Sequence, residues 1–341
     1  MLKAGLIGVG VMGRGHLDNY MRMKKEKSDI DLVAVCDIDP EKFKNVKVDF
    51  NLGTVGGEAT DFTNLTTYTD IDAMLAEQKL DLVSIALPTY LHAPNAIKCL
   101  NAGINTFCEK PMALNPAECC AMIDAANANG KRLMIGHCLR FWGQYEVLKD
   151  ITVSGRYGKP TGAYFYRGGD TPRWSHRNWL LKRECGGGAL LDQHVHDVDM
   201  VNYLFGMPKA VSTVGNIVIP GSGYDIVSTN YIYDGSLAVN AQDDWVMSGG
   251  GFDMIFRVNF ERGSAVMDSR GLRIAGADEK FYTPEYNKEN AYYKEIKYLA
   301  DCIINDKPNL INPPEDSLNT IRIVEAEIAS ADAGGVVVDV K

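Results

Sequence analysis

The stretch from Gly186 to Asp197, Gly-Gly-Gly-Ala-Leu-Leu-Asp-Gln-His-Val-His-Asp, combines residue types that can move a proton. It places the carboxylate of Asp192 four residues before the imidazole of His196, and on one helix that spacing puts both side chains on the same face. An imidazole titrates near neutral pH, so it can take a proton from a reacting hydroxyl. Three glycines before the helix allow a cofactor ring or a neighbouring backbone to approach closely. The segment predicts proton transfer on a small polar substrate.

The same segment contains a second histidine, His194, two residues before His196. Residues two apart on a helix point roughly 200° away from each other, so the two rings cannot hold one ion. We therefore expect no metal here, and we expect His194 to face a different neighbour from His196.

A dinucleotide-binding pattern opens the chain. Residues 2–7 form an apolar run, Gly8-Val9-Gly10-Val11-Met12-Gly13 follows, and residues 14–23 are expected to be helical. In a strand, glycine turn and helix of this kind, the glycines permit a tight turn and the approach of a pyrophosphate to the helix N-terminus. We take Gly8, Gly10, Val11, Met12 and Gly13 as candidate cofactor contacts.

An acidic residue, Asp37, follows the next predicted strand, residues 32–36. A carboxylate at this place accepts hydrogen bonds from a ribose diol and repels a 2'-phosphate. Its neighbour Ile38 offers no cation for a phosphate. These residues favour NAD over NADP as the cofactor.

Strands and helices alternate further along the first half. Strands are expected over 80–87, 104–108 and 132–135, and helices over 93–101 and 116–129. Lys110 directly follows one of these strands, at the edge where ligands bind in doubly wound parallel sheets. This edge adds Leu87, Pro88, His92, Glu109 and Lys110 to the candidate cofactor-binding residues.

From about residue 160 the pattern changes to alternating strands. Strands are expected over 163–166, 211–219 and 226–233, with hairpin signals at Asp234-Gly235, Arg262-Gly263 and Arg270-Gly271. We predict two domains, 1–124 with a doubly wound parallel sheet and 125–341 with an open, mostly antiparallel sheet. A terminal helix over 315–331 is able to pack back on the first domain. The open sheet face favours a subunit partner.

Composition excludes several functions. With 341 residues, 46% of them hydrophobic, the chain has ample core, and no run approaches a membrane span. A net charge of −9 argues against nucleic acid as a partner. The eight cysteines lack disulfide or zinc spacing, and the first strand begins too early for a signal peptide. We expect a cytoplasmic protein.

Aromatic and polar residues gather between the two halves. Aromatic rings suit the faces of sugar-like rings, and arginine can bind hydroxyl or carboxylate oxygens. We expect a carbohydrate or polyol substrate, although the aromatics could equally pack between domains and the arginines could pair with acidic residues. The candidate substrate residues are Arg140, Trp142, Arg167, Trp174, Trp179 and His196.

These motifs, in this order, resemble the Gfo/Idh/MocA family of glucose-fructose oxidoreductase and inositol dehydrogenase. The resemblance rests on Gly8 to Gly13, Pro88 to His92, Glu109-Lys110-Pro111 and Gly186 to Asp197, and it covers nearly the whole chain. It implies a Rossmann domain followed by an α/β domain whose open sheet often forms dimers and tetramers. It also implies that Lys110, Asp192 and His196 form the catalytic group.

The residues agree with an NAD-dependent dehydrogenase of a sugar, inositol or polyol. We assign the proton to His196, with Asp192 orienting it or the substrate, and Lys110 donating a hydrogen bond or relaying the proton. Which of Lys110 and His196 takes the proton first stays open. The alternatives are a glycosidase that retains NAD and a non-catalytic regulator that senses dinucleotide. A glucose-fructose oxidoreductase in the narrow sense is disfavoured because those relatives are exported.

Overall fold

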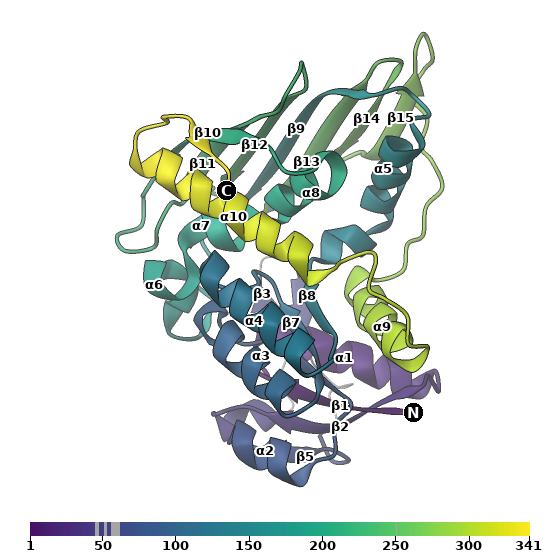
Figure 1. The fold of residues 1–341 in the computed structure, drawn as a ribbon, viewed down its shortest axis with the longest axis vertical. Coiled ribbons are helices and arrows are strands. Elements are labelled where there is room, and N and C mark those ends of the chain that lie inside the picture. Colours follow the sequence, from purple (N-terminus) through teal and green to yellow (C-terminus); the bar gives the residue numbers. More distant parts are fainter. Residues whose placement is uncertain (45–47, 51–52, 56–61, 250) are drawn as a thin grey trace. The chain divides into compact units, whose positions relative to one another are not determined.

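The computed structural model describes residues 1–44, 48–50, 53–55, 62–249 and 251–341. Contacts divide the chain into two units, each built around one large sheet (Figure 1). Among the described residues, no helix has the length and apolar character needed to cross a bilayer. The first unit is Met1–Cys138, Trp174–Arg177 and Asn290–Ser317, and the second is Leu139–Arg173, Asn178–Glu289 and Leu318–Lys341.

The first unit contains a six-stranded sheet in the order β5-β2-β1-β6-β7-β8. All of its neighbouring strands are parallel, as the sequence predicts. The strands β6, β7 and β8 are buried along their whole length, which is typical of a sheet covered on both faces. The strands are β1 (Leu2–Ile7), β2 (Ile30–Cys36), β5 (Thr66–Tyr68), β6 (Leu82–Ile85), β7 (Asn105–Glu109) and β8 (Leu133–Gly136).

The strand order reverses between β1 and β6. The chain passes from β1 to β2 in one direction and from β6 to β7 in the other, so right-handed crossovers place the connecting helices on opposite faces. Helix α1 packs against α9, and α3 packs against α4. Ligands of such sheets bind where the order reverses, at the carboxyl ends of the strands. The helices are α1 (Val11–Lys25), α2 (Ile71–Glu77), α3 (His92–Asn101), α4 (Pro116–Ala128) and α9 (Ala291–Ile304).

Shorter elements complete this unit. Two 3-10 helices, η1 (Pro40–Phe43) and η2 (Thr89–Leu91), follow β2 and β6. Strands β3 (Val48–Phe50) and β4 (Gly53–Val55) form a separate antiparallel pair.

The second unit contains an eight-stranded sheet in the order β15-β14-β13-β9-β12-β11-β10-β16. All neighbours are antiparallel except β9 and β12, so the prediction of a mostly antiparallel sheet is confirmed. The three predicted hairpins join β11 to β12, β13 to β14 and β14 to β15. The strands are β9 (Pro160–Gly169), β10 (Ala210–Asn216), β11 (Ile226–Ile232), β12 (Ala238–Asp244), β13 (Phe252–Phe260), β14 (Gly263–Asp268), β15 (Gly271–Gly276) and β16 (Val338–Asp339).

Helix α8 packs on β9 and β12, the central strands of this sheet. The terminal helix predicted over 315–331 is α10 (Pro314–Asp332). The remaining helices are α5 (Gly143–Ser154), α6 (Arg183–Gly186), α7 (Gly188–Asp192) and α8 (Val195–Phe205), with the 3-10 helices η3 (Cys138–Phe141) and η4 (His176–Leu181).

The expectation of one continuous helix carrying Asp192 and His196 is wrong. Asp192 ends α7, and His196 is the second residue of α8. The backbone N–H groups of Gln193 and His194 both donate to the carbonyl of Ala189, at 2.9 and 2.8 Å, which widens the turn. The N–H of His196 then donates to Gln193 at 3.3 Å, which tightens the next one. The four-residue spacing therefore fixes no common helix face here.

Candidate active site

The three glycines of the first turn have different surroundings. A Cβ at Gly8, where φ is +92°, would lie 2.5 Å from the carbonyl oxygen of Ala86. A Cβ at Gly13 would lie 1.9 Å from the carbonyl oxygen of Gly8, so Gly13 lets α1 pack closely on the turn. A Cβ at Gly10 would meet no described atom within 4 Å. The first and third glycines are needed for protein packing, and Gly10 leaves open space for a ligand.

Helix α1 begins beside this open space without a side-chain cap from the described residues. By contrast, α2 and α4 begin at Asp70 and Asn115, whose side chains accept hydrogen bonds from backbone N–H groups. The first turn of α1 contains no acidic residue. Its amide groups at Val11 and Met12 are therefore available to an anion such as a pyrophosphate.

Asp37 lies at the carboxyl end of β2, next to the glycine turn. Its Oδ2 accepts a hydrogen bond from the N–H of Val9 at 2.7 Å, and its Oδ1 accepts one from Asp39 at 3.0 Å. Each oxygen keeps a second lone pair with which to bind a ribose hydroxyl. Ile38 is 87% exposed and brings no positive charge to this place. The contact of Asp37 with a ribose stays a prediction.

His92 ties two of the predicted cofactor segments together. Its buried ring lies between two carbonyl oxygens, with Nδ1 2.7 Å from Pro111 and Nε2 2.8 Å from Leu87. Burial lowers the pKa of this imidazole, although both backbone contacts and Glu109 act in the opposite direction. The ring thereby fixes the loop after β6 against the segment that follows β7.

Glu109 is the last residue of β7 and is 3% exposed. Its Oε1 lies 2.7 Å from Nε2 of His16 on α1, and its Oε2 accepts the backbone N–H of Lys110 at 3.2 Å. Burial by itself raises the pKa of Glu109, but the hydrogen bond and charge of His16, with Lys110 and His92, lower it overall. Glu109 is thus a buried support for Lys110, and its role as a direct cofactor contact stays a prediction.

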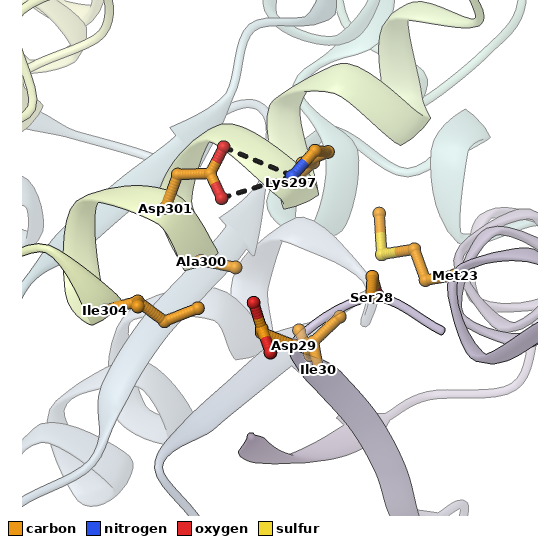
Figure 2. A pocket seen from close by; sticks show the side chains of 8 residues that line it. All are labelled: Met23, Ser28, Asp29, Ile30, Lys297, Ala300, Asp301 and Ile304. Atoms are coloured by element: carbon orange, nitrogen blue, oxygen red, sulfur yellow. Dashed lines mark hydrogen bonds and ion pairs between the residues drawn. The ribbon is translucent and has the colours of Figure 1, made fainter. Parts of the chain in front are cut away.

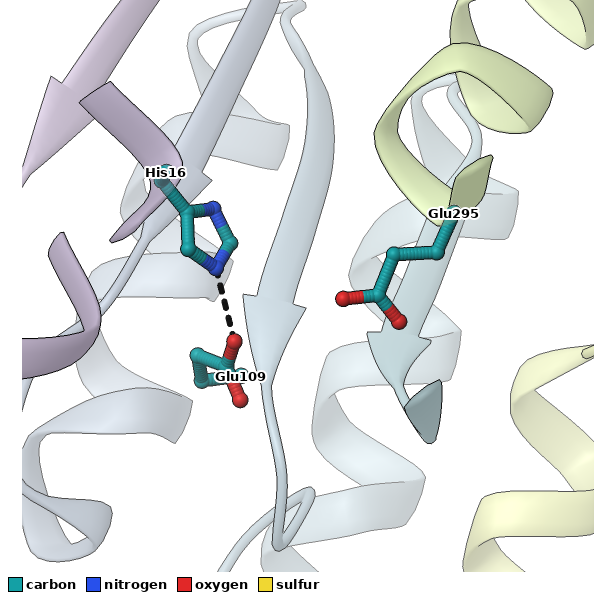
Figure 3. Close-up of side chains that lie close together, drawn as sticks. All are labelled: His16, Glu109 and Glu295. Atoms are coloured by element: carbon teal, nitrogen blue, oxygen red, sulfur yellow. Dashed lines mark hydrogen bonds and ion pairs between the residues drawn. The ribbon is translucent and has the colours of Figure 1, made fainter. Parts of the chain in front are cut away.

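A third side chain, Glu295 of α9, joins this pair (Figure 3). Ligand atoms of His16, Glu109 and Glu295 lie within 4.8 Å of one another, and all three residues are buried. The sequence analysis missed His16 and Glu295. A carboxylate at 295 within the apolar stripe of Ala291, Ile296 and Leu299 was the signal available for the latter.

In the second unit, Asp192 and His196 are half-buried, and His194 between them is buried. Nε2 of His194 lies 3.3 Å from the hydroxyl of Tyr231 and 3.5 Å from Oε1 of Glu327. The imidazole of His194 therefore contacts Tyr231 and Glu327. Gly188 packs against backbone, because a Cβ there would lie 2.8 Å from the backbone N and O of Tyr224.

Two predicted substrate residues form buried ion pairs. Arg140 contacts both carboxylate oxygens of Asp199, at 2.9 and 2.8 Å, and Arg167 contacts both of Asp197, at 3.2 and 3.1 Å. Burial lowers the pKa of Arg167, but Asp197 raises it overall. Both acidic partners lie on α8, so these arginines hold that helix. This geometry favours an indirect role over direct contact with substrate.

A buried acid at the end of β12, Asp243, was also missed. Its Oδ1 accepts a hydrogen bond from Gln193 at 3.2 Å, and the charges of Asp197, Asp244 and Asp192 act on it. Burial, and then these charges, raise the pKa of Asp243 well above its usual range. The negative charge of Asp192 therefore acts on the carboxyl group of Asp243.

The three candidate tryptophans are all half-buried. Trp174 lies in the first unit, and Trp142 and Trp179 lie in the second. Lys110 also belongs to the first unit, at the carboxyl end of β7, and is half-buried. Each unit thus contains some of the predicted site residues, and their side chains are partly accessible.

One pocket lies away from these residues (Figure 2). It adjoins Ile30, the first residue of β2, and so lies at the amino end of that strand, opposite to Asp37. Lys297 and Asp301 on its wall form an ion pair at 3.2 Å. The pocket belongs to the other end of the sheet. Its lining is Met23, Ser28, Asp29, Ile30, Lys297, Ala300, Asp301 and Ile304.

Comparison with known proteins matches both units to one family. Residues 2–137 match the model of an oxidoreductase family with an NAD-binding Rossmann fold, and residues 145–266 match the GFO/IDH/MocA C-terminal domain. The levoglucosan dehydrogenase structure in complex with NADH superposes with a TM-score of 0.86 at 22% identity, covering 100% of this chain and 99% of that one. At this identity the likeness shows the fold.

Curated relatives are similar over part of their length. A 2,7-anhydro-N-acetylneuraminate hydratase from Mediterraneibacter gnavus is 29% identical over 64% of this chain and 55% of its own length. An inositol 2-dehydrogenase from Salmonella typhimurium is 30% identical over 60% of this chain and 54% of its own. The chain spans about half the length of the curated relatives it matches.

Proposed function

Since the chain belongs to the Gfo/Idh/MocA family of oxidoreductases, with an NAD-binding Rossmann domain, we propose that it is an NAD-dependent dehydrogenase. The reaction transfers a hydride between the nicotinamide and a secondary alcohol of a sugar, an inositol or a related polyol. The observation that carries the proposal is the glycine turn at the reversal of the sheet, where Gly10 leaves open space beside the uncapped α1. The inositol and levoglucosan dehydrogenases support the substrate class.

The chemistry divides between cofactor and chain. Oxidation of a secondary alcohol removes a hydride from carbon and a proton from oxygen, and bound NAD supplies the hydride acceptor. We assign the proton to His196 and the orientation of the hydroxyl or imidazole to Asp192. Lys110 donates a hydrogen bond to the substrate oxygen or relays the proton. All three side chains are half-buried, so each is open to a ligand on one side.

The two halves of the chain have different roles in this reaction. Residues 1–124 bind the dinucleotide, and residues 125–341 bind the substrate and form the subunit interface. The half-buried Trp142, Trp174 and Trp179 supply apolar faces for a sugar ring. Arg140 and Arg167 act through the acidic residues of α8 that they hold.

A direct assay tests this function. Purified protein with NAD and a panel of sugars and inositols is expected to form NADH, and Lys110→Ala and His196→Ala are expected to lower kcat about 100-fold or more. Lys98→Ala on α3, an exposed lysine paired with Asp72, is the matched control and retains activity. Turnover at the wild-type rate in both site variants contradicts the assignment of the site.

The second candidate is a reaction without net oxidation, which the hydratase relative favours. In that reaction the substrate is consumed while the NADH level stays constant. Product analysis by mass spectrometry, run in parallel with NADH absorbance, separates the two candidates.

For the assembly, we propose a homodimer or homotetramer formed through the sheet of the second unit. The strand register places Tyr164, Val214 and Ile226 on one face of this sheet, and they are 36, 55 and 37% exposed. Apolar residues on such a face favour a second copy of the chain. Light scattering coupled to size-exclusion chromatography measures the mass, and a monomer contradicts the proposal.

For the compartment, we propose the cytoplasm. All eight cysteines, each among the described residues, are free thiols, which suits a reducing environment. Fractionation of the producing cells, with detection of the protein by antibody, tests the location.

A further inference from the structure

The buried carboxyl group of Glu295 has an environment that the dehydrogenase chemistry above does not use. Glu295 is 0% exposed, and neither of its carboxyl oxygens has a hydrogen-bond partner among the described residues. It points from α9 toward the His16 and Glu109 pair (Figure 3). A buried carboxylate without donors is costly, so this group must gain a proton or a cation.

The polar groups around Glu295 come from several elements, among them α1 and β7, which pack on α9. The carboxylate of Glu109 lies within 4.8 Å, and its negative charge acts directly on Glu295. Two carboxyl groups and one imidazole thus share a closed space. The titratable groups facing it are His16 from α1, Glu109 from β7, Cys138 from η3, Tyr292 from α9 and, through its charge on Glu109, Lys110.

We propose that Glu295 is a positioning residue that holds a buried proton, so that a neutral acid, and not a second carboxylate, lies beside Glu109. Glu109 then stays paired with His16 without a second negative charge next to it. Through its hydrogen bond to the backbone N–H of Lys110, it fixes the start of the segment that carries the lysine. The effect on Lys110 rests on the proposed function of that residue. The protonation of Glu295 does not depend on that function.

The distance between His16 and Glu109 distinguishes a proton in this cluster from a metal ion. Nε2 of His16 and Oε1 of Glu109 lie 2.7 Å apart, a hydrogen-bond distance. Two ligands of a tetrahedral zinc ion, each about 2.1 Å from the metal, lie roughly 3.4 Å apart. Burial, and then the charge of Glu109, raise the pKa of Glu295 well above its usual range, in keeping with a neutral acid.

Infrared spectroscopy of the full chain at neutral pH tests the proton directly. Protein labelled with ¹³C-glutamate is expected to show the C=O band of a protonated carboxyl group, and Glu295→Gln is expected to lose it. The spectrum of the variant is subtracted from that of the wild type, because Asp243 is a second buried acid. Its own C=O band is expected in both samples and cancels in the difference. Glu325→Gln, an exposed glutamate on α10, is the control and keeps the band. A wild-type band unchanged in Glu295→Gln overturns the proposal.

Thermal unfolding between pH 5 and 9 gives an independent test. A carboxyl group with a raised folded-state pKa binds a proton that the unfolded chain has already lost, so stability falls as pH rises. Glutamine mimics the neutral acid at all pH values. The Tm of Glu295→Gln minus that of the wild type is therefore expected to increase with pH. A constant difference, or a variant that fails to fold, contradicts a neutral Glu295.

Elemental analysis of the purified protein distinguishes a proton on Glu295 from a bound metal ion. One equivalent of a transition metal per chain, lost in Glu295→Gln, overturns the proton and replaces it with a metal site. Less than a tenth of an equivalent in both proteins supports the proton.

Kinetics test the step that leads to Lys110. In the wild type, ionisation of Glu295 at high pH places a second negative charge beside Glu109, so kcat is expected to fall as pH rises while KM stays within about twofold. Glu295→Gln cannot ionise and is expected to keep its kcat at high pH. If the wild type oxidises no substrate, the infrared and unfolding results still decide the state of Glu295. Failure of the proposed function is thus distinguishable from failure of this inference.

Discussion

The guanidinium group of Arg140 contacts both carboxylate oxygens of Asp199, and neither side chain reaches solvent. Asp199 also accepts a hydrogen bond from Thr320 at 3.2 Å, so the pair belongs to a buried network around α8. Removal of one partner leaves the other as an uncompensated buried charge. Loss of either partner is therefore expected to lower the free energy of unfolding.

Arg140→Ala is expected to lower the free energy of unfolding by about 3–5 kcal/mol, measured by urea denaturation. The matched control is Arg183→Ala, which breaks the exposed pair with Asp332 and changes stability by less than about 1 kcal/mol. Equal effects of the two variants contradict a structural role for the buried pair.

The glycine turn gives opposite expectations for two similar substitutions. Gly13→Ala brings a Cβ within 1.9 Å of the Gly8 carbonyl oxygen, so it lowers Tm by several degrees. Gly10→Ala enters open space at a φ of −75°, so it leaves Tm near the wild-type value and weakens NAD binding. Calorimetric titration with NAD and thermal unfolding measure both. Normal NAD affinity in Gly10→Ala contradicts a dinucleotide at this turn.

Asp37→Ala is expected to change the cofactor preference. The variant loses an acceptor for the ribose diol and a negative charge that repels a 2'-phosphate. The ratio of kcat/KM for NAD to that for NADP is expected to fall about tenfold or more, a difference of roughly 1.4 kcal/mol. Asp72→Ala, an exposed carboxylate on α2, is the control and leaves the ratio unchanged. An unchanged ratio in Asp37→Ala removes this residue from the cofactor site.

Asp243 gives a pH dependence whose sign follows from its raised pKa. Burial and then Asp197 raise the pKa of Asp243 in the folded state, so the folded chain keeps a proton that the unfolded chain loses above about pH 4. Stability is therefore lost as pH rises from that value toward the folded-state pKa. Asp243→Asn removes this loss, and its Tm relative to the wild type is expected to increase with pH. A decrease contradicts a neutral Asp243.

Patterns that depend on neighbours in sequence predicted most of the fold. The apolar run before Gly8 and the hairpin signals at Arg262-Gly263 and Arg270-Gly271 specify local geometry, and the structure contains the corresponding elements. The interruption between Asp192 and His196 was not predictable in this way. It arises because two N–H groups share the carbonyl of Ala189, which the residue spacing does not reveal.

The partners of buried charged groups were also beyond sequence reasoning. Arg140 and Arg167 have the residue type of ligand-binding groups, yet their partners are acidic residues of α8 far along the chain. The same holds for Glu295, which joins His16 and Glu109 from a distant helix. Tertiary packing decides which of these charges meet, and no spacing rule contains that information.

The parallel pairing of β9 with β12 has a consequence for how the second unit folds. The strands β10, β11 and β12 form one array of consecutive neighbours, and β13, β14 and β15 form another, so each array can assemble from contacts close in sequence. Strand β9 precedes both arrays and pairs with one member of each, Tyr164 facing Asn240 on one side and Arg257 on the other. Pairing β9 with β12 and β13 closes longer loops than any pairing within either array, and it is expected to be slower than the formation of the arrays. Because Arg167 lies on that strand, its ion pair with Asp197 fixes β9 to α8, the helix that also packs on β12, and so favours the pairing of β9 with the first array.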